Sequence, residues 1–255
     1  MSLLEVNGLQ IAFGGLCAVK DFSLDLPRGA LRGLIGPNGA GTTTVFNLLT
    51  GVYCPHRGSI RLDGRELNGL RPFEIAHAGL SRTFQNIRLF PDLSVQDNVR
   101  VGAHLRGSHS LHGTLLRTRT YRRQEEEILG RAKELLKVFG LDDRRDERAA
   151  NLPYGDQRRL EIARALATRP KVLLLDEPAA GMNPQEKSEL MNLIRFIRDK
   201  FDLGILLIEH DMKLVMNVCE RITVLDHGET IAVGTAGEIQ CNPKVIEAYL
   251  GEAVT

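Results

Sequence analysis

The chain has little cysteine, almost no net charge and no long hydrophobic run. Its 255 residues include four cysteines whose spacing matches no metal site, which predicts reduced thiols in a reducing compartment. A net charge of +1 gives no field that would recruit nucleic acid. No apolar run approaches the ~18 residues that span a bilayer, and residues 1–10 do not resemble a secretory signal. A cytoplasmic protein is expected, with any membrane link made through a partner.

Short apolar segments alternate with amphipathic helical patterns in the second half of the chain. Strands are predicted at 172–175, 204–208 and 221–225. Between the first two lies a predicted helix with one buried face, formed by Leu190, Leu193, Ile194, Ile197 and Phe201. Buried strands that alternate with helices are typical of a parallel sheet covered on both faces.

The first and middle parts of the chain have other patterns. Strand candidates at 3–11, 19–26 and 59–62 are separated by turns, and no helix is predicted before Thr42, which favours an antiparallel or mixed sheet layer. Residues 95–164 are mostly helical and highly charged, with few Pro and Gly in their middle, so we interpret them as an inserted helical subdomain. Each motif described below occurs once, which excludes a tandem two-domain architecture.

A glycine-rich loop lies between a short strand and a helix at 34–45, LIGPNGAGTTTV. Its glycine spacing, followed by two threonines, is a P-loop pattern, in which backbone N–H groups and the helix start point at phosphate oxygens. Thr43 lies where a hydroxyl binds Mg²⁺, and Thr44 can reach the phosphate nearest the ribose. The predicted nucleotide contacts are Gly36, Pro37, Asn38, Gly39, Ala40, Gly41, Thr42, Thr43 and Thr44.

Thr42 occupies the position at which the P-loop pattern has lysine. A lysine there places a positive charge against the outer phosphates. At ~4 Å and an effective dielectric constant of ~20, one such charge pair contributes about 4 kcal/mol before desolvation is subtracted. A neutral threonine cannot supply this contribution, so we expect weaker nucleotide binding and severely reduced hydrolysis.

Three further segments carry polar side chains suited to phosphate chemistry. The strand in KVLLLDEP ends in Asp176, which suits Mg²⁺, and Glu177, which can polarise a water for attack on the γ-phosphate. His210 follows the next strand in LLIEHDM, at the sheet edge that the strand ends share. Gln85, in RTFQNIRLF, can reach Mg²⁺ or the attacking water. Taken singly, each residue has an ordinary structural alternative. The predicted catalytic residues are Glu177, His210 and Gln85, and the predicted metal ligands are Thr43, Gln85 and Asp176.

Residues 151–167, NLPYGDQRRLEIARALA, predict another helix, with Gly155 just ahead of it. A helix N-terminus can bind an anion, but the P-loop already supplies one such site in this chain. A second site is useful if it serves the nucleotide that another subunit holds.

The P-loop, Gln85, LPYGDQ, LLLDEP and His210, in this order, resemble the nucleotide-binding domain of ABC transporters over essentially the whole chain. Finer features resemble the ATP-binding subunits of branched-chain amino acid importers, namely FGGLCAV, RTFQNIRLFPDLSVQDNV, the charged helical insertion, DEPAAGMNP, IEHDMKLVM and AYLGEA. The resemblance implies an α/β fold: a P-loop NTPase (RecA-like) core sheet with an N-terminal antiparallel β layer and an inserted α-helical subdomain. It implies one domain over 1–255, with the catalytic core at 1–92 and 165–255 and the helical subdomain, including the signature motif, at 93–164.

The resemblance also implies partners. A pair of ATP-binding subunits, identical or related, would sandwich two ATP molecules, with Mg²⁺, between the P-loop of one and the signature segment of the other. Phe13 would stack on adenine, and 181–184 would contact the second subunit. The signature residues, which would face the partner's nucleotide, are Leu152, Pro153, Tyr154, Gly155 and Asp156. The loop at Gln85 would receive an integral membrane permease at the cytoplasmic face of the inner (plasma) membrane, and a periplasmic binding protein would act indirectly. No nucleic acid partner is expected.

Two further positions depart from the family pattern. Pro153 replaces a Ser and lacks an N–H, which removes one γ-phosphate contact, and Asn183 replaces the usual Asp, as fits the importer branch. The predicted function is that of an ATPase subunit energising import of branched-chain or other hydrophobic amino acids, with hydrolysis at its own site impaired by Thr42. Two alternatives stay open: a non-hydrolysing, ATP-sensing subunit, and the ATPase of a lipid or glycan exporter.

Overall fold

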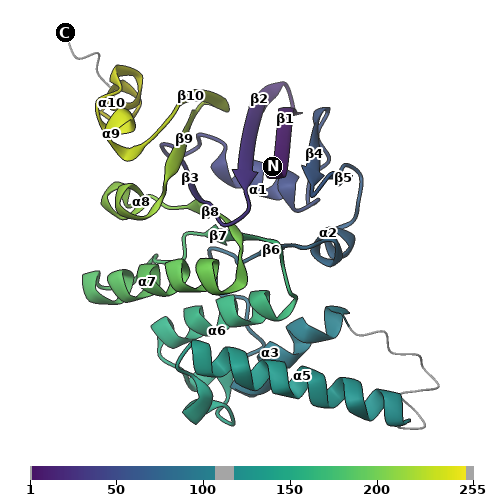
Figure 1. Cartoon of the computed structure of the whole chain (residues 1–255). Coiled ribbons are helices and arrows are strands. Elements are labelled where there is room, and N and C mark those ends of the chain that lie inside the picture. The colour runs from purple at the N-terminus through teal and green to yellow at the C-terminus, as the bar shows by residue number, and fades with distance from the viewer. Residues whose placement is uncertain (1, 107–117, 251–255) are drawn as a thin grey trace. The chain divides into compact units, whose positions relative to one another are not determined.

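Two units make up the chain in a computed structural model, which describes residues 2–106 and 118–250 (Figure 1). Met1–Gln85 and Lys171–Thr255 form unit 1, and Asn86–Pro170 form unit 2. Unit 1 contains both β-sheets and the P-loop, and unit 2 is helical. Within the described ranges, none of the helices has the length and apolar character that a bilayer crossing requires.

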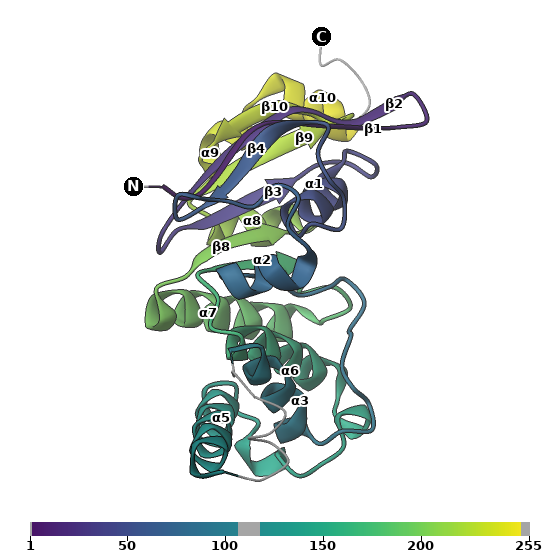
Figure 2. The same ribbon diagram turned by 90° about the vertical axis from the view of Figure 1, so that its right-hand side faces the viewer.

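An antiparallel sheet forms the N-terminal layer of unit 1. Its strands lie in the order β2-β1-β4-β5, and every pairing is antiparallel. The strands are β1 (Ser2–Phe13), β2 (Leu16–Pro27), β4 (Arg57–Leu62) and β5 (Arg65–Glu66). Figure 2 shows β1, β2 and β4 side by side. The predicted antiparallel layer is therefore confirmed.

A second, six-stranded sheet carries the P-loop. Its order is β10-β9-β3-β8-β7-β6, and all its pairings are parallel except that of the edge strand β10. Its strands are β3 (Leu31–Ile35), β6 (Leu80–Arg82), β7 (Val172–Asp176), β8 (Gly204–Ile208), β9 (Arg221–Asp226) and β10 (Glu229–Gly234). Every residue of β7 and β8 is buried, as expected for strands with both faces covered. Because β3, β7 and β8 are parallel neighbours, the segments that follow them leave the sheet at one edge.

Helices cover this sheet within unit 1, and one core cluster joins both sheets with α1. The helices are α1 (Thr42–Leu49), α2 (Pro72–Ala78), α7 (Pro184–Phe201), α8 (Met212–Val218), α9 (Ala236–Gln240) and α10 (Pro243–Leu250). The buried face of α7 contains Met191 in addition to the predicted Leu190, Ile194 and Ile197. Leu193 and Phe201, which were predicted on that face, are only half-buried.

In unit 2 the described residues include the α-helices α3 (Val95–Ala103), α5 (Arg119–Val138) and α6 (Tyr154–Ala167). Each contacts the other two. A Cβ on Gly102 of α3 would lie 2.3 Å from the backbone oxygen of Arg164 in α6, so only glycine permits this approach.

Unit 2 spans 86–170, whereas the helical subdomain was predicted at 93–164. The earlier start has a physical reason in the segment before α3. Phe90 is hydrogen-bonded through both its backbone N–H and its C=O to the buried side chain of Asn98, and Arg88 N–H donates to Glu161 of α6. The later end follows from α6, which continues to Ala167.

Candidate nucleotide site

The P-loop connects β3 to α1 and is shaped by close backbone approaches. A Cβ on Gly36 would lie 2.4 Å from the carbonyl oxygen of Leu225, so a larger residue would displace β9 or the loop. Gly41 has φ +101°, and a Cβ there would lie 2.6 Å from the carbonyl oxygen of Ala18. Within the loop, Ala40 N–H donates to Pro37 C=O at 3.0 Å. These two glycines allow a turn that other residues cannot form.

The first turn of α1 offers N–H groups to a ligand. Among the described residues, no side chain caps this helix, and its first turn contains no acidic residue. Uncapped N–H groups at a helix start form a natural phosphate site. A hollow of about 250 Å³ lies beside this turn, lined by Leu16, Cys17, Ala18, Gly39, Gly41, Thr42, Thr43, Thr44 and His227. The described residues that line it include no Lys or Arg. No side chain in this lining therefore supplies the positive charge that a lysine at position 42 would provide.

The individual P-loop residues differ in exposure. Thr42 is only 8 % exposed, whereas Thr43 is exposed and Thr44 is half-buried. Pro37, Asn38, Gly39 and Ala40 line a second hollow of about 790 Å³, whose other side is formed partly by α10.

The carboxylates of the DE pair follow β7 in different environments. Asp176 is the last residue of β7 and is 3 % exposed. Glu177 has φ +47°, a conformation that non-glycine residues rarely adopt and that is concentrated at functional sites. Its backbone N–H donates to the carbonyl oxygen of Ile208 at 2.9 Å, which ties the turn after β7 to the end of β8.

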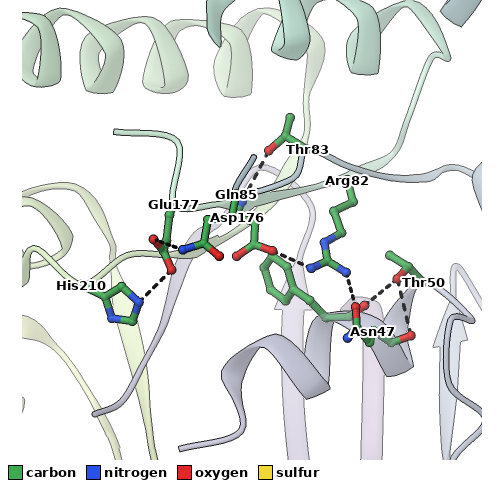
Figure 3. Close-up of polar contacts among 9 residues, drawn as sticks. Asn47, Thr50, Arg82, Thr83, Gln85, Asp176, Glu177 and His210 are labelled. Atoms are coloured by element: carbon green, nitrogen blue, oxygen red, sulfur yellow. Dashed lines mark hydrogen bonds and ion pairs between the residues drawn. The ribbon is translucent and has the colours of Figure 1, made fainter. Parts of the chain in front are cut away.

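The structure brings Gln85, Glu177 and His210 into one hydrogen-bonded group (Figure 3). Gln85 Nε2 donates to Glu177 Oε2 at 2.9 Å, and His210 Nε2 lies 2.8 Å from Glu177 Oε1. Both carboxylate oxygens of Glu177 are therefore engaged by side chains from two other segments. The residues lie 92 and 33 positions apart from Glu177 in sequence, and only the sheet topology unites them.

The neighbours of His210 fix the loop that carries it. Glu209 is 5 % exposed and accepts from Ala179 N–H at 2.8 Å, and burial raises the pKa of its carboxyl above the ordinary value. Asp211 accepts from Lys187 Nζ at 2.9 Å, and this hydrogen bond lowers the pKa of Asp211. Glu209 thus joins the end of β8 to the segment just after Glu177.

Arg82 adds a contact to which no role was assigned from the sequence. Its Nη2 donates to Asp176 Oδ2 at 2.5 Å, and its Nη1 donates to Asn47 Oδ1 of α1 at 2.7 Å. The sequence shows only an arginine three residues before Gln85, and this does not reveal its partners. Glu209, which directly precedes His210, was likewise not predicted as a site residue.

Phe13 ends β1 and is 45 % exposed, so one part of its ring is open to a ligand. The Tyr53 ring packs edge-on against it, with centroids 5.1 Å apart. Tyr53 is also exposed, at 36 %, and an exposed aromatic pair suits the stacking role predicted for Phe13.

The signature segment lies in unit 2 at the start of α6. The helix begins at Tyr154, with Pro153 as its N-cap, so the expectation that Gly155 precedes the helix is wrong. Proline suits a helix start because its missing N–H would have no intrahelical partner there. Leu152 is buried and Tyr154 is 45 % exposed. The carboxylate of Asp156 accepts from Arg144 Nη1 at 2.9 Å.

A magnesium ion fits the donors at this site. Mg²⁺ prefers oxygen ligands and usually combines one or two protein oxygens with substrate phosphates and waters. Within the described residues, no group of three His, Cys, Asp or Glu side chains can hold a metal alone. The exposed Thr43 hydroxyl, the Asp176 carboxylate and the Gln85 amide oxygen are of the right chemical type, and phosphates would complete the set.

The chain matches the family model described as ABC transporter over residues 19–180, and the model described as branched-chain amino acid ATP-binding cassette transporter over residues 229–255. It is 52 % identical over 251 residues to the high-affinity branched-chain amino acid transport ATP-binding protein LivG of Salmonella typhimurium (strain LT2), covering 98 % of each chain. The chain belongs to the ABC transporter ATP-binding subunits.

Two further comparisons place it within this family. The lipopolysaccharide export system ATP-binding protein LptB of Escherichia coli (strain K12) is 36 % identical, over 99 % of this chain and 98 % of that protein. The crystal structure of an ATP-binding cassette of an ABC transporter in its ADP conformation has a TM-score of 0.86 and 30 % identity, covering 99 % of this chain and 100 % of that one. The predicted family, fold class and ATPase class are therefore confirmed: the chain is a nucleotide-binding, ABC-type ATPase subunit of the amino acid importer branch.

Proposed function

We propose that the chain energises the import of branched-chain or other hydrophobic amino acids through a membrane permease. The group formed by Gln85, Glu177 and His210, at the sheet edge where the P-loop begins, supports the ATP-hydrolysing part of this proposal. The 52 % identity to LivG favours amino acid import over other transport.

In the proposed mechanism, N–H groups of the P-loop and α1 bind the phosphates of ATP. Glu177 accepts a hydrogen bond from the attacking water and so directs it at the γ-phosphate. Gln85 and His210 hold the Glu177 carboxylate in place before the water arrives, because each contacts one of its two oxygens. Thr43, Asp176 and Gln85 would hold Mg²⁺, which supplies charge neutralisation at the phosphates.

Hydrolysis at this site is expected to be slow because of Thr42. The backbone cradle remains, so ATP still binds, but the side-chain charge that opposes the developing phosphate charge is missing. Leu152, Pro153, Tyr154, Gly155 and Asp156 would complete the nucleotide site of a second ATPase subunit. That site can work even if the site of this chain does not.

The proposed partners follow from this arrangement. They are a second ATP-binding subunit, identical or related, and integral membrane permease subunits, with a periplasmic binding protein acting indirectly. The chain would then lie at the cytoplasmic face of the inner membrane as a peripheral subunit.

Two other functions have a specific observation in their favour. The threonine at position 42 favours a non-hydrolysing, ATP-sensing subunit. The 36 % identity to LptB keeps an ATPase of lipid or glycan export as a candidate, although the identity to LivG is considerably higher.

Transport by a reconstituted complex tests the proposal. The chain would be purified with the permease and ATPase subunits that accompany it and placed in proteoliposomes with ATP on its own side. We expect ATP-dependent uptake of radiolabelled leucine from the opposite side, in the presence of the periplasmic binding protein. Extraction of a glycolipid without amino acid uptake would support the exporter alternative instead.

A further inference from the structure

Arg82 is a buried charge that joins two parts of the nucleotide site. The side chain of Arg82 is 6 % exposed and that of Asp176 is 4 % exposed. One guanidinium nitrogen donates to Asp176 at the end of β7, and another donates to Asn47 in α1 (Figure 3). Arg82 therefore connects the carboxylate to the helix that begins at the P-loop.

The guanidinium is itself held in place by packing. Its central carbon lies 5.4 Å from the ring centroid of Phe46 and 5.1 Å from that of Phe84. Its planar fork makes two directed bonds at once, which a lysine ammonium cannot reproduce in the same geometry. A buried ion pair is a weak source of net stability, because desolvation offsets most of the attraction. The main effect of Arg82 is therefore to orient the Asp176 carboxylate and not to add net stability.

Asp176 is held from two directions, and one of its oxygens remains open. Its backbone N–H lies 3.4 Å from Thr83 Oγ1, the hydroxyl of the residue after Arg82. The Arg82 bond uses Oδ2 of the carboxylate. Among the described residues, no hydrogen bond or ion pair reaches Oδ1. A carboxylate fixed through one oxygen presents the other in a defined direction.

We propose that Arg82 is a positioning residue for the metal of the nucleotide site. It fixes the Asp176 carboxylate through Oδ2, leaves Oδ1 to a divalent cation, and ties both to α1 through Asn47. This inference rests on the proposed function, in which Asp176 serves Mg²⁺. Correct placement of the metal matters more in this chain, because Thr42 supplies no charge and the metal must neutralise a larger share of the phosphate charge.

Binding of Mn²⁺ in the presence of ATP, followed by electron paramagnetic resonance, tests the inference without requiring hydrolysis. The variants are Arg82→Gln, Arg82→Lys and Asn47→Ala in the full chain. Arg32→Gln is the matched control, since the Arg32 side chain is 18 % exposed and pairs with Asp25 at 3.7 Å in the same unit. ATP affinity in EDTA and the melting temperature are measured for every variant.

We expect Arg82→Gln to weaken ATP-dependent Mn²⁺ binding by about 10- to 100-fold, as is usual when a group that orients a metal ligand is lost. Asn47→Ala should weaken it less and in the same direction, and Arg82→Lys should restore part of the loss. Arg32→Gln should bind Mn²⁺ as the wild type does. ATP affinity in EDTA should be the same in all variants.

Mn²⁺ binding by Arg82→Gln that equals or exceeds that of the wild type would overturn the positioning role, because Arg82 would then be a counter-ion or a competitor of the metal. If Arg82→Gln does not fold, wild-type Mn²⁺ affinity in both Arg82→Lys and Asn47→Ala overturns it equally. A wild-type chain that binds ATP but no added Mn²⁺ contradicts the proposed metal site, and the inference fails with it. Mn²⁺ binding that is normal in the wild type and in every variant contradicts the inference alone.

Discussion

The ion pair inside α6 provides a quantitative test of how unit 2 is stabilised. Arg158 Nη1 lies 3.0 Å from Glu161 Oε2, and their side chains are only 1 % and 2 % exposed. Arg158 also reaches the Tyr154 hydroxyl at 3.3 Å, and Glu161 accepts from the backbone N–H of Arg88. The pair therefore links the signature helix to the segment that follows Gln85.

Removing one partner leaves a buried group without its counter-charge, which typically costs about 3–5 kcal/mol. We expect a loss of this size for both Glu161→Gln and Arg158→Met. Replacing both residues by methionine should leave stability within about 1–2 kcal/mol of the wild type, because neither member of the pair is left buried without the other. The coupling between the two positions should then be at least about 3 kcal/mol.

Urea unfolding followed by circular dichroism measures these changes, with the helical transition analysed separately if the two units unfold in steps. The control is Glu127→Gln in α5, whose side chain is 59 % exposed and pairs with Arg123 at 3.2 Å. Such an exposed pair should contribute almost nothing. The reasoning is refuted if Glu161→Gln costs no more than Glu127→Gln, or if the double variant loses the sum of the two single losses.

Three further results are expected. Gly41→Ala should abolish binding of a fluorescent ATP analogue, because the added Cβ would lie 2.6 Å from the Ala18 carbonyl oxygen. Gly39→Ala, at φ +83° with open space around it, should cost only about 1–2 kcal/mol of backbone strain. Equal losses of nucleotide affinity in the two variants would contradict this geometry. Burial raises the pKa of Glu209, so its contribution to stability is complete below the unfolded pKa and is lost as pH rises through the folded pKa. The melting temperature of the wild type relative to Glu209→Gln should therefore fall as the pH rises above the ordinary glutamate pKa of 4.5, and a pH-independent difference would exclude this effect. Burial also raises the pKa of Cys219 to about 12, so iodoacetamide at pH 8 should label the exposed Cys54 and Cys241 in minutes and leave Cys219 unmodified, as mass spectrometry can check.

Much of the fold follows from local sequence pattern. The apolar runs in β7 and β8 and the amphipathic face of α7 are periodic enough to predict a parallel sheet with helices on it. The elements that were not predicted include β5, β6, α2 and β10. Only Ile75 is buried in α2, and only Gly234 is buried in β10, so neither segment has a strong hydrophobic period.

The candidate site was predictable where a motif specifies backbone shape or chemistry, as in the P-loop and at Glu177. The contacts between distant segments were not. Arg82 meets a carboxylate 94 residues away, and this pairing depends on β6 and β7 lying side by side. The start of α6 was misplaced by reading Gly155 as the residue before the helix, although Pro153 is well suited to that boundary.

Mg²⁺-dependent ATP hydrolysis by the wild-type chain and by Thr42→Lys, each reconstituted with the partner subunits, tests the central claim most directly. Glu177→Gln in the Thr42→Lys background serves as the control. Up to about 4 kcal/mol of charge interaction is absent at position 42, so lysine should raise the rate by as much as about a thousandfold, and Glu177→Gln should remove the gain. Equal rates for the wild type and Thr42→Lys would contradict the claim that Thr42 limits an otherwise complete catalytic site.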